Sequence, residues 1–231
     1  MYPEIKEAGG LGNAINKEFE RNHSALRVSM TEADIHKDFV TYARVENGPK
    51  FSQVYIAAEK KLYLFDFWRD GVCLAHGNTD NLTDLIQVLE FWLCNDVTTR
   101  ELSAQFDFVE PNEKAAAFDE GREVAYTWNL IWNDSHRAEI KDFVELALKD
   151  DLLSKLFPYT SLYILCFSRC TGYPYSYDLP SVTPKLDGTF IVRNFDNSII
   201  GEGNVQEAFR LLKNNLPENV GPAVKGTKED L

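Results

Sequence analysis

The run Leu162-Tyr163-Ile164-Leu165-Cys166-Phe167 leads directly into Arg169-Cys170-Thr171-Gly172-Tyr173-Pro174-Tyr175-Ser176-Tyr177-Asp178-Leu179-Pro180. A short apolar run of this kind is typical of a buried strand. The loop after it gathers three tyrosines, an arginine, a cysteine and an aspartate around two prolines. Rigid aromatic and polar groups on a loop favour a binding site or an interface. Because the tyrosines alternate, an extended chain would project all three to one side. There they would form either a structural lid over the sheet or a loop that contacts a partner or ligand.

Strand patterns occur before and after a central helical region. Alternating apolar residues and turn residues predict antiparallel strands, and an Asp70-Gly71 pair predicts a hairpin between two of them. The expected strands are Leu26–Met30, Phe39–Val45, Phe51–Ala57, Leu62–Phe67, Val72–His76, Leu162–Phe167, Thr189–Phe195 and Ser198–Gly201.

Apolar residues at three- and four-residue spacing predict the helices. The expected segments are 3–22, with glycines that break its first turns, then 81–93, 98–106, 111–118, 123–132, 138–156 and 205–216. Thr98 with Glu101 forms a capping-box pattern, and Asn204 is placed to cap the last helix.

These elements predict an α+β fold, with antiparallel β-meanders in the N- and C-terminal parts around a central acidic helical block. We expect residues 1–80 to form a helix and sheet, 81–157 the helical block, 158–217 strands and a helix, and 218–231 a flexible tail. The parts would form one integrated domain or two tightly packed subdomains.

The charge of the chain is strongly acidic and uneven. The formal net charge is −12 over 231 residues. Residues 81–160 alone carry 16 acidic and 7 basic side chains, a net charge of −9. Such a field repels nucleic acid and anionic membranes and attracts basic partners, although a solvated acidic surface needs no partner at all. We therefore expect neither a nucleic acid nor a membrane as partner.

The cellular compartment is expected to be the cytoplasm. The start Met1-Tyr2-Pro3-Glu4 has no basic segment followed by an apolar run, so no signal peptide is expected. The sequence contains no run of 18 apolar residues, so no membrane span is expected. Four cysteines in a chain of this length read as reduced thiols.

No catalytic, cofactor-binding or metal site is predicted. Cys166 and Cys170 would be half of a zinc site, and no second pair accompanies them. Cys170 as a nucleophile would need a base such as His76 or His136, and no spacing joins these residues. The glycines around Gly10 follow no strand, so they do not fit a dinucleotide-binding turn.

The candidate partner-binding residues come from three places. The tyrosine loop and a hairpin turn supply aromatic and charged groups, and the helical block supplies carboxylates. The full set is Arg169, Tyr173, Tyr175, Tyr177, Asp178, Glu139, Asp142, Glu145, Asp150, Asp151, Trp68 and Arg69.

The segments Phe157–Ser161 and Phe167–Tyr175 form a signature that resembles a bacterial family of uncharacterised proteins labelled natural product biosynthesis proteins. The similarity covers most of the chain, from Tyr2 to the last helix. The resemblance implies a bacterial cytoplasmic protein without an established catalytic mechanism. It also implies relatives in secondary-metabolite clusters, and some that act as immunity proteins beside secreted toxins.

Two functions follow as hypotheses. The first is a non-enzymatic immunity protein that binds and neutralises a basic toxin domain, because no catalytic constellation is present and acidic residues would steer a basic partner. The second is an accessory enzyme or ligand-binding protein of natural-product biosynthesis that uses the loop 168–178. A plain scaffold subunit is a third possibility.

Overall fold

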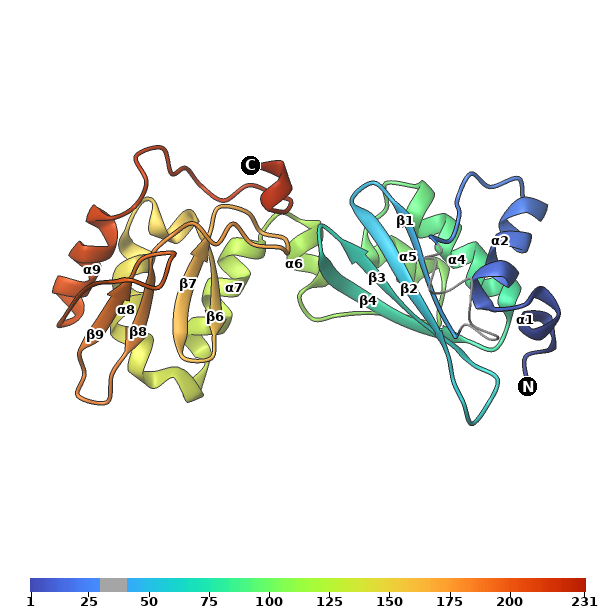
Figure 1. Cartoon of the computed structure of the whole chain (residues 1–231), viewed down its shortest axis with the longest axis horizontal. Coiled ribbons are helices and arrows are strands. Elements are labelled where there is room, and N and C mark those ends of the chain that lie inside the picture. Colours follow the sequence, from blue (N-terminus) through green and yellow to red (C-terminus); the bar gives the residue numbers. More distant parts are fainter. Residues whose placement is uncertain (30–40) are drawn as a thin grey trace. The chain divides into compact units, whose positions relative to one another are not determined.

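The computed structural model describes residues 1–29 and 41–231, which divide into two compact units, Met1–Asp119 and Glu120–Leu231 (Figure 1). The predicted α+β class is confirmed, because antiparallel sheets lie in both the N- and C-terminal parts. The helical block does not form a unit of its own, in contrast to the expected boundaries at 80 and 157. Its first helices belong to the N-terminal unit and its later helices to the C-terminal unit.

The N-terminal unit combines short helices with a five-stranded sheet. Its helices are α1 (Pro3–Ala8), α2 (Leu11–Arg21), α4 (Leu82–Cys94), α5 (Thr99–Gln105) and α6 (Ala115–Asp119). Its strands are β1 (Tyr42–Asn47), β2 (Lys50–Ile56), β3 (Tyr63–Arg69), β4 (Val72–Thr79) and β5 (Val109–Pro111). The strands follow one another in the order β1-β2-β3-β4-β5, so the sheet is a meander.

The turn between β3 and β4 is the two-residue hairpin predicted from the sequence. Asp70 and Gly71 have φ values of 53° and 69°. Two consecutive positive φ angles define the type I′ turn, whose twist matches that of the strands beside it.

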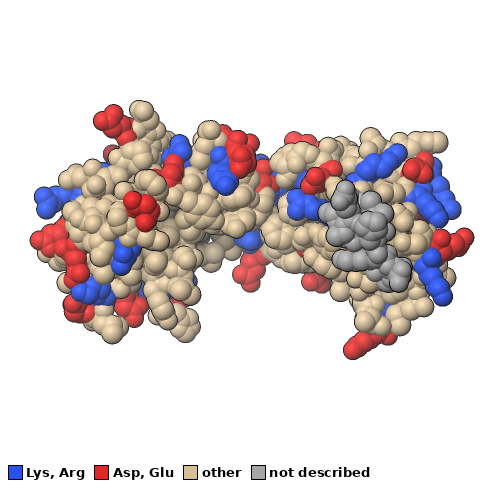
Figure 2. Space-filling view, in the orientation of Figure 1, with Lys and Arg blue, Asp and Glu red and all other residues tan. Residues whose placement is uncertain are grey.

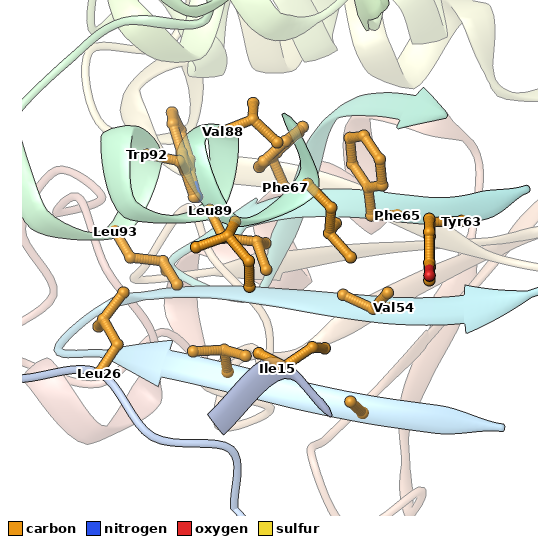
Figure 3. Packing of buried hydrophobic residues seen from close by; sticks show 14 of the residues in the cluster. Ile15, Leu26, Val54, Tyr63, Phe65, Phe67, Val88, Leu89, Trp92 and Leu93 are labelled. Carbon is orange, nitrogen blue, oxygen red and sulfur yellow. The ribbon is translucent and has the colours of Figure 1, made fainter. Parts of the chain in front are cut away.

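Helix α4 forms the centre of the N-terminal core (Figure 3). Trp92 and Leu89 lie over the strands, where Trp92 meets Phe67 with ring centroids 5.8 Å apart. Ile15 of α2 and Leu26 complete the cluster, and every labelled side chain in it is buried.

The C-terminal unit has the same two-layer plan. Its helices are α7 (Glu123–Asn133), α8 (Lys141–Lys149) and α9 (Val205–Asn214), with 3₁₀ turns η1 (Ser135–Ile140), η2 (Leu153–Lys155) and η3 (Lys228–Asp230). Its strands are β6 (Phe157–Ser161), β7 (Ile164–Ser168), β8 (Ser181–Pro184), β9 (Phe190–Arg193) and β10 (Ile199–Gly203). The sheet order is β10-β9-β8-β7-β6.

The three helices of this unit cover one face of its sheet. Trp128 of α7, Phe143 of α8 and Leu212 of α9 belong to one buried cluster with Phe167 and Val192 of the strands. The capping boxes at Thr98 and Asn204 are both present, as predicted.

Several expected elements differ from the structure. Pro111 was expected to begin a helix, but it ends β5, and the helix begins at Ala115. The long helix predicted over 138–156 is interrupted at Asp150, whose backbone is extended. Strands β5, β6 and β8 were not predicted.

Two predicted strands lie beside residues 30–40, which the structure does not describe. Met30, at the end of the expected strand Leu26–Met30, and the start of the expected strand Phe39–Val45 lie outside the described residues. The expected strand at Leu26 is reduced to a single bridge between Val28 and Val45. Among the described residues, no helix has the length and apolar character needed to cross a membrane.

Candidate functional site

The sheet of the C-terminal unit has one face that its helices do not cover. Side chains alternate between faces along a strand, so Leu165 and Phe167 of β7 enter the helical core while Ile164 and Cys166 point to the other side. The loop 169–180 lies on this second face, as shown by the ring contacts of Tyr175. The tyrosine loop therefore forms a partial cover over the outer face of the sheet.

The tyrosines of the loop contact one another, as their alternation predicted. Tyr175 is at the centre: its ring stacks on Tyr159 of β6 with centroids 4.4 Å apart and an interplanar angle of 26°. Tyr173 and Tyr177 meet Tyr175 edge to face at 5.7 Å and 6.1 Å. Each aromatic pair contributes about 0.5–1.5 kcal/mol beyond its buried area, so these contacts stabilise the packed arrangement of the tyrosines.

Two serines fix the path of the loop. The Oγ of Ser168, which is fully buried, accepts the backbone N–H groups of Cys170 (3.1 Å) and Ser176 (3.2 Å). The Oγ of Ser176 accepts the N–H of Arg169 at 3.1 Å. These bonds close the loop back onto the end of β7.

Arg169 and Asp178 clamp the two ends of the loop together. The Arg169 Nε and Nη2 atoms lie 2.8 Å and 2.5 Å from Asp178 Oδ2. Burial acts to raise the pKa of Asp178, but hydrogen bonds from Arg169 and Ser176 hold it below its usual value. Asp178 therefore stays ionised at neutral pH and is engaged with Arg169 within the loop.

The segment expected to be a flexible tail lies against the loop instead. Thr171 donates its N–H to Val224 O (3.0 Å), and Val224 donates to Arg169 O (2.9 Å). Further along, Gly172 donates to Gly226 O (2.6 Å), and Cys170 and Val224 form a parallel bridge. The expectation was wrong because the backbone of this segment satisfies its hydrogen bonds on the loop, which its glycine- and proline-rich composition does not reveal.

An open hollow of about 460 Å³ lies beside the tyrosine cluster. Strands β6, β7 and β8, the loop and the turn between β9 and β10 all contribute to it. Its lining is Tyr159, Thr160, Ser161, Ile164, Cys166, Tyr175, Tyr177, Leu179, Ser181, Asn194, Phe195 and Asn197. None of these lining residues carries a carboxylate, an ammonium or a guanidinium group, so recognition in the hollow relies on aromatic surface and neutral hydrogen-bonding groups.

The ionisable groups of the hollow stay neutral. Burial raises the pKa of Tyr159, of Tyr175 and of Cys166 above their usual values. Their hydroxyl and thiol groups therefore keep their protons at neutral pH and remain available as hydrogen-bond donors. Tyr177 is 47% exposed and Phe195 is 64% exposed, so both rings offer apolar surface at the rim.

The carboxylates predicted to bind a partner lie on the helical layer, on the other side of the sheet from the hollow. Glu139 of η1, with Asp142 and Glu145 of α8, is exposed, and Asp151 is exposed just after α8. Asp150 is different: both its oxygens accept hydrogen bonds from Lys213 Nζ at 2.8 Å, and Oδ1 also accepts from Leu153 N–H. The acidic residues and the tyrosines therefore do not form one continuous contact surface.

Trp68 and Arg69 belong to the N-terminal unit. Trp68 stacks on Phe51 with centroids 5.2 Å apart. Arg69 is only 8% exposed, and its Nη2 lies 2.8 Å from Asp119 Oδ1. Asp119 Oδ2 in turn accepts from the backbone N–H of Thr99 at 2.8 Å. Arg69 thus holds β3 to the start of α5 and is not presented to a partner.

Cys170 does not reach the hollow. It is fully buried, its Sγ lies 3.3 Å from Ser168 Oγ, and burial raises the pKa of its thiol. A nucleophile needs access and a base, so the structure gives Cys170 a packing role. Within the described ranges, no group of three or more His, Cys, Asp or Glu side chains is arranged to hold a metal ion.

Sequence reasoning missed one wall of the hollow. Asn194, Phe195 and Asn197 lie in the turn after β9 and reach the hollow only through the order of the sheet. Phe195 in the Asn-Phe-Asp-Asn sequence of this turn could have indicated a binding surface, since turns seldom need a large apolar side chain.

The comparisons with known proteins concern this unit. Residues 122–227 match a family described as "Family of unknown function (DUF6193)". The matched segment contains the tyrosine loop, the hollow and the C-terminal segment that lies against the loop. No curated protein and no solved structure matches the chain.

In the view of Figure 2, acidic and basic side chains are interspersed over the surface. The net negative charge of the chain is therefore not gathered into one acidic field on this face.

Proposed function

We propose that this chain is a non-enzymatic binding protein whose contact surface is the hollow of the C-terminal sheet. More specifically, we propose an immunity protein that binds and neutralises a cognate bacterial toxin domain of basic character. The observation that carries the proposal is the hollow itself: a neutral, tyrosine-lined surface braced on a rigid sheet, without a catalytic pair among its lining residues.

The composition of the hollow supports protein recognition. Tyrosine, serine and asparagine dominate the binding loops of antibodies because tyrosine offers large contact area at low entropic cost, and small polar residues adapt their hydrogen bonds. The hollow has the same mixture, with Tyr159, Tyr175 and Tyr177 beside Ser181 and Asn194. Since the rings are already packed on one another, little ordering is left to oppose binding.

The overall charge supports a basic partner. A net charge of −12 attracts a cationic domain over distances of about a Debye length and raises the association rate. Steering of this kind does not require the acidic residues to lie in the contact surface. The exposed carboxylates on α8 therefore support the encounter, while the hollow supports the bound state.

The proposal places the protein in the cytoplasm of a bacterium, where it would meet an incoming or newly made toxin. All four cysteines are free thiols, which is compatible with a reducing compartment. The resemblance carried by the tyrosine-loop signature, with relatives beside secreted toxins, points the same way.

A matched pair of tyrosine variants tests the contact surface. The tagged protein is used to capture its partner from a lysate of its native host, and the purified partner is then titrated against variants. Tyr177→Ser removes a rim ring of the hollow, whereas Tyr163→Ser removes a ring that is 74% exposed in the β6–β7 turn and does not line it.

We expect Tyr177→Ser to weaken binding by about 30-fold or more, the size of a central interface residue, and to abolish protection of cells that express the toxin. Tyr163→Ser should leave both unchanged. Equal effects of the two variants, or protection that persists with Tyr177→Ser, would contradict the proposed surface.

Salt dependence tests the charge. Between 50 and 500 mM NaCl the association rate should fall, while the dissociation rate stays nearly constant. Glu145→Lys with Asp151→Lys should slow association further and leave dissociation unchanged. A partner whose association is insensitive to salt would argue against electrostatic steering.

The second candidate is a ligand-binding protein or accessory enzyme of natural-product biosynthesis. The volume of the hollow, about 460 Å³, favours it because sites for small molecules occupy about 300–1,000 Å³. Native mass spectrometry of the purified protein distinguishes the two candidates. A small molecule that is retained by the wild type and lost in Tyr177→Ser, without any protein partner, would favour this second function.

A further inference from the structure

The outer face of the N-terminal sheet carries a thiol beside an imidazole. Cys73 and His76 both lie on β4, and Cys73 Sγ is 3.6 Å from His76 Nε2. With the proton of the imidazole on Nδ1, Nε2 accepts a hydrogen bond from the thiol. Cys73 is half-buried and His76 is exposed, so the pair lies at the surface.

A bulge in β4 makes this contact possible. Residues three apart on a regular strand point to opposite faces. Here Phe67 pairs with Ala75, but the next residue, Trp68, pairs with Cys73, so that Leu74 is an extra residue in β4. Leu74 and Ala75 both enter the core. The bulge thereby brings Cys73 and His76 to the same face, as bulges near functional sites often do.

Two carboxylates flank His76 on the neighbouring strands. Asp66 of β3 and Glu110 of β5 are both its direct cross-strand partners. Direct partners in an antiparallel pair share a face, with Cβ atoms about 4.5–5.5 Å apart. The row Asp66–His76–Glu110 therefore places a carboxylate side chain on each side of the imidazole.

Asn112 positions the thiol from a third side. Its Nδ2 donates to Cys73 O at 3.1 Å and lies 3.7 Å from Cys73 Sγ. Sγ also lies 3.7 Å from Ala75 O. An amide donor aimed at the sulfur stabilises a developing negative charge there.

The thiol needs a base in order to react. Burial raises the pKa of Cys73, and the charge of Asp66 raises it further, while Asn112 and Lys114 act in the opposite direction. Cys73 is therefore a protonated thiol at neutral pH, and the thiolate is the reactive species. A neighbouring acceptor such as His76 Nε2, 3.6 Å from Sγ, can take the proton as the reaction proceeds.

We propose that Cys73 is a nucleophilic thiol that forms mixed disulfides with low-molecular-weight disulfides, with His76 as its general base. In this step the Cys73 S–H proton passes to His76 Nε2 and the sulfur attacks one sulfur of the small disulfide. The S–S bond of the small molecule breaks, and its leaving thiolate takes the proton from His76. The products are one protein mixed disulfide and one free thiol, so no other oxidant is needed.

The neighbourhood favours an aromatic disulfide. Trp68 is the cross-strand partner of Cys73, and its ring is stacked on Phe51. A neutral aromatic disulfide also avoids repulsion by Asp66 and Glu110, which slows anionic reagents. We therefore choose 4,4′-dithiodipyridine, a neutral aromatic disulfide, as the probe.

The experiment measures the rate at which each cysteine of the full chain reacts with this probe, by mass spectrometry of digested samples. Cys94 is exposed and has no hydrogen-bonded histidine among the described contacts, so it serves as the internal control. At pH 7 we expect Cys73 to react faster than Cys94 despite its greater burial. His76→Asn should slow Cys73 by about 10-fold or more and leave the rate of Cys94 unchanged.

An unchanged rate of Cys73 in His76→Asn overturns the proposal. The wild-type pH profile gives a second test that needs no variant. General-base assistance predicts that the rate of Cys73 already rises at a pH below the range in which thiols ionise directly. A rate that instead rises only with direct ionisation of a thiol, above pH 8, also overturns it.

Discussion

The two units share one plan and use their polar groups in different ways. In the part of the chain that the structure describes, each has helices on one face of a five-stranded antiparallel sheet and none on the other, which is here called the open face. In the N-terminal unit, Arg69 and Asp119 form a buried ion pair. Two further ionisable side chains, Asp66 and His76, lie on the open face of the sheet. In the C-terminal unit, the open face holds a hollow lined by neutral groups.

The difference shows that the fold does not fix the chemistry of the open sheet face. A sheet face that carries titratable groups is suited to proton transfer, because its charges respond to one another. A sheet face of tyrosines, amides and hydroxyls is suited to complementary contact, because its hydrogen-bonding capacity is constant around neutral pH.

The largest effect is expected from the buried ion pair of the N-terminal unit. Arg69→Met leaves the carboxylate of Asp119, whose side chain is 5% exposed, without its counter-charge. Breaking a buried pair costs about 3–5 kcal/mol of unfolding free energy. Native-state hydrogen exchange of the β3 amides measures the loss within this unit.

The control is the C-terminal pair of Lys213 with Asp150, whose side chains are 31% and 17% exposed. Lys213→Met should cost clearly less, because water solvates the remaining carboxylate. Equal costs for the two variants would mean that both units rely on buried charge to the same extent.

A smaller effect is expected from glycines beneath large side chains. A Cβ at Gly77 of β4 would lie 2.3 Å from Phe65 Cε2 and 3.1 Å from Phe108 O. Phe65 is fixed among aromatic neighbours, so Gly77→Ala should cost about 1–3 kcal/mol. Urea titration gives the unfolding free energy.

Gly201→Ala in β10 is the matched change in the other sheet. Its Cβ would meet Leu211 Cδ1 at 2.8 Å, the flexible end of a partly exposed side chain that can rotate away. We expect the smaller cost here. A cost equal to that of Gly77→Ala would show that the C-terminal sheet is packed as rigidly as the N-terminal one.

Acid titration should give opposite signs in the two units. Burial raises the pKa of Asp66, so its contribution to stability is fully present below the unfolded value of about 3.9 and is lost as the pH rises through the folded pKa. For Asp150, burial acts to raise the pKa, but hydrogen bonds from Leu153 and Lys213 lower it overall. Its contribution is present above about 3.9 and is lost as the pH falls through the folded pKa.

Urea titrations between pH 2.5 and 6 measure both effects. The stability of the wild type relative to Asp66→Asn should decrease with rising pH, whereas its stability relative to Asp150→Asn should increase. Two curves of the same sign would show that the two carboxylates are in similar environments.

The smallest effect is expected on the exposed surface of α8. Glu145→Gln removes the pair with Lys149, whose side chains are 53% and 67% exposed. Exposed pairs four residues apart on a helix contribute about 0.3–0.5 kcal/mol. Thermal unfolding should therefore shift by a few degrees at most, and a larger shift would indicate that this helix depends on its surface charge.

Much of the fold could be predicted from periodicity, and the errors have local causes. Strands β6 and β8 contain Pro158 and Pro184, which lowered their strand signal although an edge strand such as β6 tolerates proline. Pro111 fits a helix start as well as a strand end, and only its pairing with Ala75 decides between them. The helical block was divided between two sheets because periodicity does not say which sheet a helix covers.

The candidate sites show the same limit. The tyrosine cluster could be predicted because its members are adjacent in sequence. Phe195 and Asn197 reach the hollow only through strand order, and Cys73 meets His76 only because of a bulge. Cys73 and His76 are three residues apart, and on a regular strand this spacing places side chains on opposite faces. No sequence pattern could therefore have predicted their contact.

The contact between the tyrosine loop and residues 223–228 also sets an order of events during synthesis. The tyrosine loop leaves the ribosome some fifty residues before residues 224–228, the segment with which it forms backbone hydrogen bonds. Domains fold as they emerge, so the N-terminal unit can be complete while the hollow still lacks its final support. The loop therefore gains its last backbone hydrogen bonds only after residues 224–228 have left the ribosome.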